Sequence, residues 1–241
     1  IIDGSGIPGF HGDVAISGGN IMEVGHVSGD ADQVLDAKGM VIAPGFVDNH
    51  THYDAQVIWD PLCTYSCYHG VTTVVTGNCS LGLAPAHSYD HDMLSSVLSH
   101  VEAIPLEAIR EGVTWSWETV PEYLDALDRK LGVNVASLIG HSAVRRYVMG
   151  EASQDREATG TEIEEMKAIV REGIEAGALG VSFERNYRHF DWDGRLAPTN
   201  LATDAEILAV ASVVDEVGVG VIQVGGDQAL GKQIAEVSGR P

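Results

Sequence analysis

Apolar β-branched runs alternate with helical patterns along most of this chain, and this alternation restricts the possible folds. Five runs are rich in apolar and β-branched residues, as expected of strands buried on both faces: residues 41–48, 71–76, 133–139, 179–183 and 219–224. Repeated strand–helix units favour a parallel sheet with right-handed crossovers. Eight such units close a barrel of about 250 residues. We therefore predict an α/β fold, an incomplete (β/α)8 TIM-type barrel with about five of its eight strands. A doubly wound sheet is the alternative, but no G-x-G-x-x-G follows any of these strands.

Two helix starts are predicted between the later strands. Thr161 with Glu164, and Thr203 with Glu206, match the S/T-x-x-E capping box. Apolar residues at helical spacing follow each pair, as in helices that pack one face on a sheet.

The first 43 residues have a different pattern. Residues 13–17 and 21–24 alternate in polarity around a Gly-Gly-Asn turn, which predicts a β-hairpin in a small β unit. We place the domain boundary between residues 43 and 44, with the barrel segment at 44–241. The chain starts at Ile1 within a strand-and-turn pattern and stops at Pro241 where another element is expected. We therefore expect it to be cut at both ends.

Composition restricts partners and location. With 14 Lys and Arg against 35 Asp and Glu, the formal charge of −21 disfavours nucleic acid and anionic membranes. No run of about 18 apolar residues and no basic leader is present, so we expect a soluble, cytoplasmic protein. The three cysteines make a disulfide framework improbable. We expect Cys63 and Cys67 to be packing residues.

Polar side chains follow each of the first four strands. His50 and His52 come after the first and Cys79 after the second; His141 follows the third, and a segment ending in Tyr187 follows the fourth. Side chains at i and i+2 of a strand share a face, so both imidazoles can reach one cation. In such barrels the working groups lie at the C-terminal strand ends. Two imidazoles and a thiolate there predict a zinc site.

Several separate motifs resemble one known family. PGFVDNHTHYDAQ, GNCS, IPLEAIREGVTWSWETVPEYLDAL, NVASLIGHSAVRRYVMG and EAGALGVS occur in the order found in the amidohydrolase superfamily. They are most similar to its N-acyl-D-amino-acid deacylase (D-aminoacylase-like) branch. The likeness covers most of residues 40–185. Residues 1–43 resemble part of that family's small β-sandwich domain.

The resemblance assigns roles to individual residues. His50 and His52 match the His-x-His metal ligands, and Cys79 matches the cysteine that replaces a bridging carboxylated lysine of related enzymes. Tyr187 lies where a family tyrosine reaches the substrate, although this segment agrees with the family pattern only there and at Ser182. His141 is either a second substrate-binding residue or a core histidine.

One departure leaves the metal site open. Gly225 and Gly226 stand where the family has a histidine ligand after the fifth strand. The site is then mononuclear and completed beyond residue 241, or His141 or His189 substitutes, or metal binding is impaired. The family's catalytic aspartate is also expected beyond residue 241, so no catalytic residue is assigned within this chain.

The resemblance implies a zinc-dependent amidohydrolase that cleaves a small-molecule N-acyl substrate, an N-acyl-D-amino acid, with a zinc-activated water. One alternative is a cyclic-amide hydrolase of the hydantoinase or dihydroorotase type, which Cys79 disfavours because those enzymes use a lysine there. Another is a non-catalytic scaffold with the same barrel. Assembly into a homo-oligomer stays open. We expect the 241 residues alone to be inactive and to associate through exposed strand edges.

Overall fold

The computed structural model describes residues 1–240 as two compact units, Ile1–Phe46 and a second that begins at Val47. In the first unit, β1 (Asp13–Ser17) pairs antiparallel with β2 (Asn20–Gly25), which confirms the predicted hairpin. Gly18 and Gly19 form the turn with φ values of 57° and 78°, the left-handed conformation that a tight hairpin turn requires.

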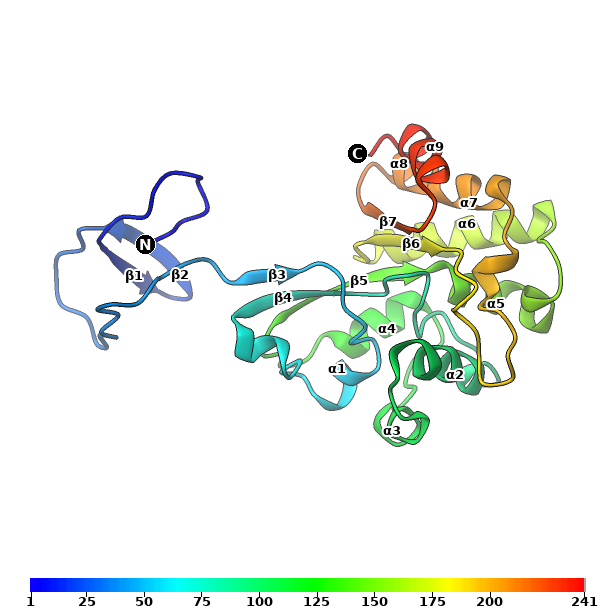
Figure 1. Ribbon diagram of the computed structural model, residues 1–241, viewed down its shortest axis with the longest axis horizontal. Coiled ribbons are helices and arrows are strands. Elements are labelled where there is room, and N and C mark those ends of the chain that lie inside the picture. The colour runs from blue at the N-terminus through cyan, green and yellow to red at the C-terminus, as the bar shows by residue number, and fades with distance from the viewer. Residues whose placement is uncertain (241) are drawn as a thin grey trace. The chain divides into compact units, whose positions relative to one another are not determined.

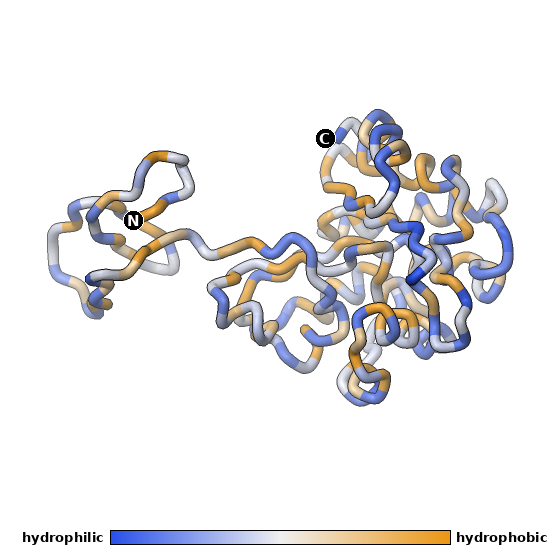
Figure 2. The backbone as a smooth tube through the Cα atoms, in the orientation of Figure 1, coloured by the Kyte–Doolittle hydropathy of each residue, from blue (hydrophilic) through white to orange (hydrophobic). Residues whose placement is uncertain are grey.

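A five-stranded sheet forms the centre of the second unit (Figure 1). Its order follows the chain: β3 (Phe46–Asp48), β4 (Val71–Thr76), β5 (Asn134–Gly140), β6 (Gly180–Glu184) and β7 (Val221–Gly225). Strands β4 to β7 pair in parallel. Figure 2 shows hydrophobic colour along much of these strands, and Val74, Val181 and Phe183 are almost fully buried. The predicted incomplete TIM-type barrel is therefore confirmed.

The first predicted strand is much shorter than expected. Residues 41–48 were predicted to be one strand, but β3 contains only residues 46–48. Pro44 and Gly45 precede it directly, and proline cannot donate a ladder hydrogen bond. The segment of residues 41–45 is therefore outside the sheet.

Helices fill the connections between the strands (Figure 1). They are α1 (Gln56–Trp59), α2 (His91–Glu102), α3 (Leu106–Gly112), α4 (Val120–Leu127), α5 (His141–Met149), α6 (Gly160–Glu175), α7 (Asp204–Ala211), α8 (Val213–Val217) and α9 (Gln228–Ser238), with short 3-10 turns at Ser66–His69, Gly150–Gln154 and Pro198–Leu201. Helix α6 packs closely, because a Cβ atom at Gly173 would lie 2.6 Å from Ile139 Cδ1 of β5. Its buried residues are Met166, Val170, Gly173 and Ile174.

The two predicted helix starts need correction. Helix α6 is capped by Thr159 with Glu162, and not by Thr161 with Glu164. Both pairs match the pattern, but Arg156 donates two hydrogen bonds to Glu162 and so stabilises the earlier start. Thr203 caps α7 as predicted, whereas the side chain of Glu206 is buried and pairs elsewhere.

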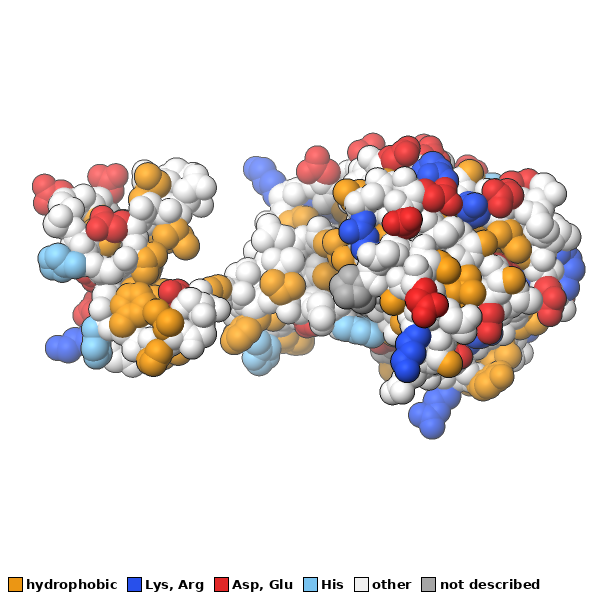
Figure 3. Space-filling view, turned by 90° about the horizontal axis from the view of Figure 1, so that it is seen from above, with side chains coloured by type: hydrophobic (Ala, Val, Ile, Leu, Met, Phe, Trp, Pro, Cys, Tyr) orange, Lys and Arg blue, Asp and Glu red, His pale blue; other side chains and the backbone are white. Residues whose placement is uncertain are grey.

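Charged side chains of both signs are spread over the face of the second unit seen in Figure 3. Within residues 1–240, no helix is long and apolar enough to cross a membrane.

Candidate metal centre

His50 and His52 follow β3 in an extended segment that runs beside β4. Between them, Thr51 donates two hydrogen bonds to the Val75 carbonyl, from its backbone N at 3.0 Å and from Oγ1 at 2.7 Å. This pairing buries Thr51, so the neighbouring histidines turn to the opposite side. Their ring centroids lie 5.4 Å apart. The predicted shared direction of the two imidazoles is thus present, although both residues lie beyond the strand itself.

Cys79 lies in a tight turn after β4. Gly77, Cys79 and Ser80 have φ values of 73°, 56° and 65°, a region that non-glycine residues seldom occupy. Side chains of other segments hold this turn. The Gly77 N–H donates to Asp54 Oδ1 at 2.7 Å, and the Ser182 hydroxyl of β6 donates to the Gly77 carbonyl at 2.5 Å. The backbone strain is therefore balanced by tertiary hydrogen bonds at the predicted metal ligand.

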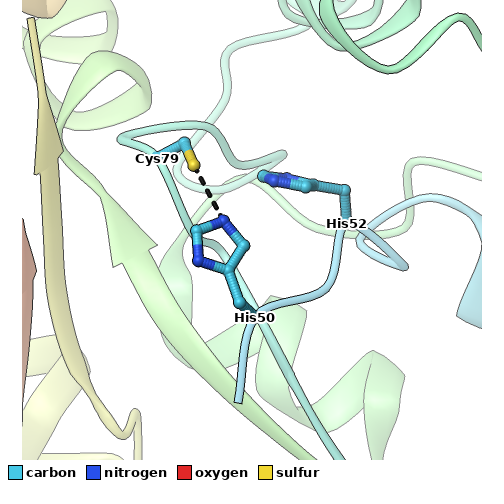
Figure 4. A group of neighbouring side chains, drawn as sticks. All are labelled: His50, His52 and Cys79. Atoms are coloured by element: carbon cyan, nitrogen blue, oxygen red, sulfur yellow. Dashed lines mark hydrogen bonds between the residues drawn. The ribbon is translucent and has the colours of Figure 1, made fainter. Parts of the chain in front are cut away.

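The three predicted ligands come together (Figure 4). His50 Nε2 lies 3.0 Å from Cys79 Sγ, and one ligand atom from each of His50, His52 and Cys79 lies within 4.8 Å of the other two. His52 Nδ1 is buried without a hydrogen-bond partner. Two imidazole nitrogens and a sulfur are donors that zinc accepts. The residues present therefore fit a zinc ion.

The electrostatic environment of His52 suits metal binding. Burial, followed by the nearby charge of His50 and then His189, lowers the pKa of His52 to about 4. His52 is therefore neutral at pH 7, as a metal ligand must be. Glu102 Oε1, at the end of α2, lies 3.5 Å from His52 Nε2. Burial and then the charge of Glu184 raise the pKa of Glu102.

A further carboxylate, that of Glu184, lies at the end of β6. Burial raises the pKa of the Cys79 thiol, and hydrogen bonding to Glu184 raises it further. Glu184 Oε1 also lies 3.9 Å from His189 Nε2. Because a cation stabilises a thiolate, metal binding would offset these effects at Cys79.

The sequence alone did not identify three of these neighbours: Glu184, Glu102 and Asp54. The position of Glu184 at the end of the fourth predicted strand could have marked it as a candidate site residue. The positions of Glu102 and Asp54 near the site result from tertiary packing, which local sequence patterns do not reveal. Asp54 is fully buried, and burial raises its pKa to about 7.

The other two predicted site residues are not among the grouped ligand atoms. His141 is fully buried; its Nδ1 lies 2.5 Å from the Thr199 hydroxyl and its Nε2 3.3 Å from Glu206 Oε1. Tyr187 is 83% exposed in the segment after β6. A role of either residue in substrate binding stays a prediction. Of the two histidines considered as substitute ligands, His189 is the one whose charge acts on His52.

The sequence is similar to a family model and to individual proteins. A model described as "Amidohydrolase family" matches residues 33–237. An uncharacterized protein of Mycobacterium tuberculosis is 42% identical over 194 residues, which cover 76% of this chain and 31% of that protein. A D-aminoacylase of Alcaligenes xylosoxydans xylosoxydans is 36% identical over 213 residues, which cover 87% of this chain and 39% of that enzyme.

Structural similarity agrees with these matches. The crystal structure of N-acyl-D-glutamate deacylase from Bordetella bronchiseptica, complexed with zinc and a phosphonate inhibitor, superposes with a TM-score of 0.77 at 28% identity. The superposition covers 99% of this chain and 48% of that one. The chain thus spans 31–39% of the length of the curated relatives named above.

Proposed function

Because the chain belongs to the amidohydrolase family, we propose that its protein hydrolyses the amide bond of an N-acyl-D-amino acid, with a zinc ion held by His50, His52 and Cys79. One observation carries this proposal: ligand atoms of these three residues, from two adjacent strand ends, lie within 4.8 Å of one another. A bound zinc ion would polarise the amide carbonyl and activate water.

The chain's own residues hold and orient the ligands. Glu102 lies beside one nitrogen of His52 and can fix the tautomer of its ring, as carboxylates next to metal-bound histidines do. The hydrogen bonds around Gly77 keep Cys79 in its unusual backbone conformation. The ligand geometry is therefore set before metal arrives, which reduces the ordering cost of binding.

The substrate class is taken from the relatives. The D-aminoacylase and the N-acyl-D-glutamate deacylase named above act, by their names, on D-configured acyl amino acids. Because this chain spans only part of their length, activity, substrate and zinc are all proposals. An aspartate beyond residue 241 is proposed as the general base and acid. The cysteines Cys63, Cys67 and Cys79 are free, which suits the reducing cytoplasm as the proposed location.

The test uses the full-length protein. We expect it to release the free amino acid from N-acetyl-D-amino acids and to leave the L enantiomers largely intact. Chelation should abolish activity and added zinc should restore it. His50→Ala should lose both zinc and activity, whereas the control His26→Ala, at an exposed position, should keep both.

Other results would contradict the proposal in distinguishable ways. Hydrolysis of hydantoin or dihydroorotate without hydrolysis of acyl amino acids would favour the cyclic-amide alternative. Folded protein that binds no zinc and cleaves none of these substrates would favour a non-catalytic scaffold.

A further inference from the structure

Cys79 and Ser80 are the two central residues of a four-residue turn, which is closed by a hydrogen bond from the Leu81 N–H to the Asn78 carbonyl at 2.9 Å. Both central residues have a positive φ, 56° and 65°, as in type I′ turns. Glycine, asparagine and aspartate dominate such positions because they tolerate this backbone conformation. A cysteine and a serine there are strained, so the turn needs support from outside itself.

The side chain of Ser80 supplies part of this support, at a position where a glycine would adopt the same backbone without strain. Its hydroxyl oxygen lies 3.0 Å from that of Ser142, in the first turn of α5. It also accepts a hydrogen bond at 3.0 Å from the Ser142 backbone N–H, which donates to the Ser80 carbonyl as well, at 3.1 Å. Both side chains are almost fully buried. Ser80 is therefore bonded to α5 through its side chain and its backbone.

The segment after β6 in turn holds Ser142. The Ser142 hydroxyl oxygen accepts a hydrogen bond from the Thr199 backbone N–H at 3.3 Å. Thr199 Oγ1 lies 2.5 Å from Nδ1 of His141, and both residues are buried. A buried polar chain thus joins the turn after β4, the helix after β5 and the segment after β6. Buried networks whose members all have partners rigidify the structure around them.

The end of β5 leaves room for the turn to approach α5. A Cβ atom built on Gly140 would lie 2.8 Å from the Ser80 carbonyl oxygen, closer than real Cβ contacts come. Gly140 has a φ of −73°, which any residue can adopt. Glycine at residue 140 is therefore explained by the close approach of the turn and not by backbone conformation.

We propose that the Ser80–Ser142 hydroxyl pair is a positioning element of the metal centre. It holds the Cys79 turn in its left-handed form and so keeps Cys79 Sγ 3.0 Å from His50 Nε2. This inference rests on the proposed zinc centre of His50, His52 and Cys79, and it adds residues that act on the metal only through Cys79. Ser80 has two opposed effects, because its backbone strains the turn while its hydroxyl supports it.

Three substitutions separate these effects. Ser80→Ala removes the hydroxyl and keeps the backbone strain. Ser80→Gly removes both. Ser142→Ala removes the partner hydroxyl and leaves the sequence of the turn unchanged. The matched control is Ser153→Ala, because the Ser153 hydroxyl is equally buried but donates to the Gly150 carbonyl, at 2.6 Å, within a 3-10 turn.

The full-length protein is assayed for zinc affinity by competition with a chromophoric chelator, for the thiolate-to-cobalt band of its cobalt(II) form, and for urea unfolding without metal. Ser80→Ala and Ser142→Ala should each bind zinc about tenfold more weakly, shift the cobalt band and unfold at lower urea concentration. Ser80→Gly should unfold close to wild type, because glycine relieves the strain, and yet bind zinc about tenfold more weakly, because the turn is no longer held. Ser153→Ala should unfold earlier but keep wild-type zinc affinity and an unchanged band.

Contrary results are distinguishable. Wild-type zinc affinity with an unchanged cobalt band in either Ser80→Gly or Ser142→Ala would show that the hydroxyl pair does not position Cys79. An equal loss of affinity in Ser153→Ala would show that zinc binding follows general stability, which also overturns the proposal. A wild-type protein that takes up no zinc, or a His50→Ala variant that binds zinc as tightly, would instead refute the zinc centre on which the proposal rests.

Discussion

The side-chain oxygen of Gln223 accepts a hydrogen bond at 2.8 Å from the backbone N–H of Cys79, although 144 residues separate them in sequence. Gln223 lies in β7 and pairs in register with Ser182 of β6. The Ser182 hydroxyl accepts from the backbone N–H of Ser80 at 3.0 Å. Two neighbouring strands therefore hold the turn that presents the candidate thiolate ligand.

Replacing Gln223 should loosen this turn. In Gln223→Leu, the Cys79 N–H loses its acceptor, which should cost about 1 kcal/mol of unfolding free energy. Zinc affinity should fall about tenfold, as when a residue that orients a ligand is removed. Gln223→Glu keeps an acceptor oxygen and serves as the control in the same chelator competition. Unchanged affinity in Gln223→Leu would show that the turn holds its conformation without this bond.

The two buried cysteines should respond differently to removal. Cys79→Ala should lower zinc affinity by more than about a hundredfold, because it removes a proposed ligand. Cys63 is fully buried and is not among the grouped ligand atoms, so Cys63→Ala should keep zinc and lose only about 1 kcal/mol of stability. Zinc per chain after dialysis and denaturant unfolding measure the two effects. Equal loss of zinc in both variants would refute the placement of the ligand at Cys79.

The sheet was predictable because its strands are buried on both faces. Strand β4 covers the predicted residues 71–76 in full, since a β-branched run between turn residues has few alternatives. The three proposed ligands were also predictable, because they directly follow strands that end at one rim. Strand β3 was harder to delimit, because an apolar run continues on both sides of its Pro-Gly break.

Residues that act across strands were not predictable from local pattern. The hydrogen bond between Gln223 and Cys79 and the pairing of Glu184 with Gly225 depend on the register of neighbouring strands. That register is set by packing over the whole sheet. The start of α6 also escaped prediction, because Thr159 and Thr161 both precede a glutamate at the right spacing and only Arg156 distinguishes them.

Removing a charge from the buried ion pair of Arg145 and Glu206 should lower stability more than removing one from an exposed pair. Arg145 Nε donates to Glu206 Oε1 at 2.8 Å, and both side chains are fully buried. In Glu206→Gln the Arg145 charge stays buried without its partner, so the unfolding free energy should fall by about 3–5 kcal/mol. The control is Glu216→Gln, which removes a partly exposed pair with Arg171 and should cost less than about 1 kcal/mol. Similar losses in urea unfolding of both variants would contradict the assignment.

The charged cap at the start of α6 should make the stability of the protein depend on pH in the acidic range. Glu162 accepts from the Thr159 backbone N–H at 2.7 Å and from both terminal nitrogens of Arg156 at 2.9 and 2.7 Å. The hydrogen bonds from Arg156 are the main cause that lowers the pKa of Glu162 from 4.5 to about 2. A carboxyl group whose pKa is lowered on folding stabilises the folded state at pH values above its unfolded pKa. This contribution disappears as the pH falls through its folded pKa.

Glu162→Ala should therefore destabilise the protein by about 1 kcal/mol at pH 7, the usual cost of losing a helix cap. The expected loss of stability is small because Arg156 is half-exposed, so that solvent screens its ion pair with Glu162. The difference from wild type should shrink as the pH falls from 4.5 towards 2, the interval between the two pKa values of Glu162. Urea unfolding across this range measures it, and Glu164→Ala, an exposed glutamate within the same helix, is the control for helix propensity. A constant difference from pH 7 to pH 2 would mean that Glu162 stabilises α6 by packing and not by its charge.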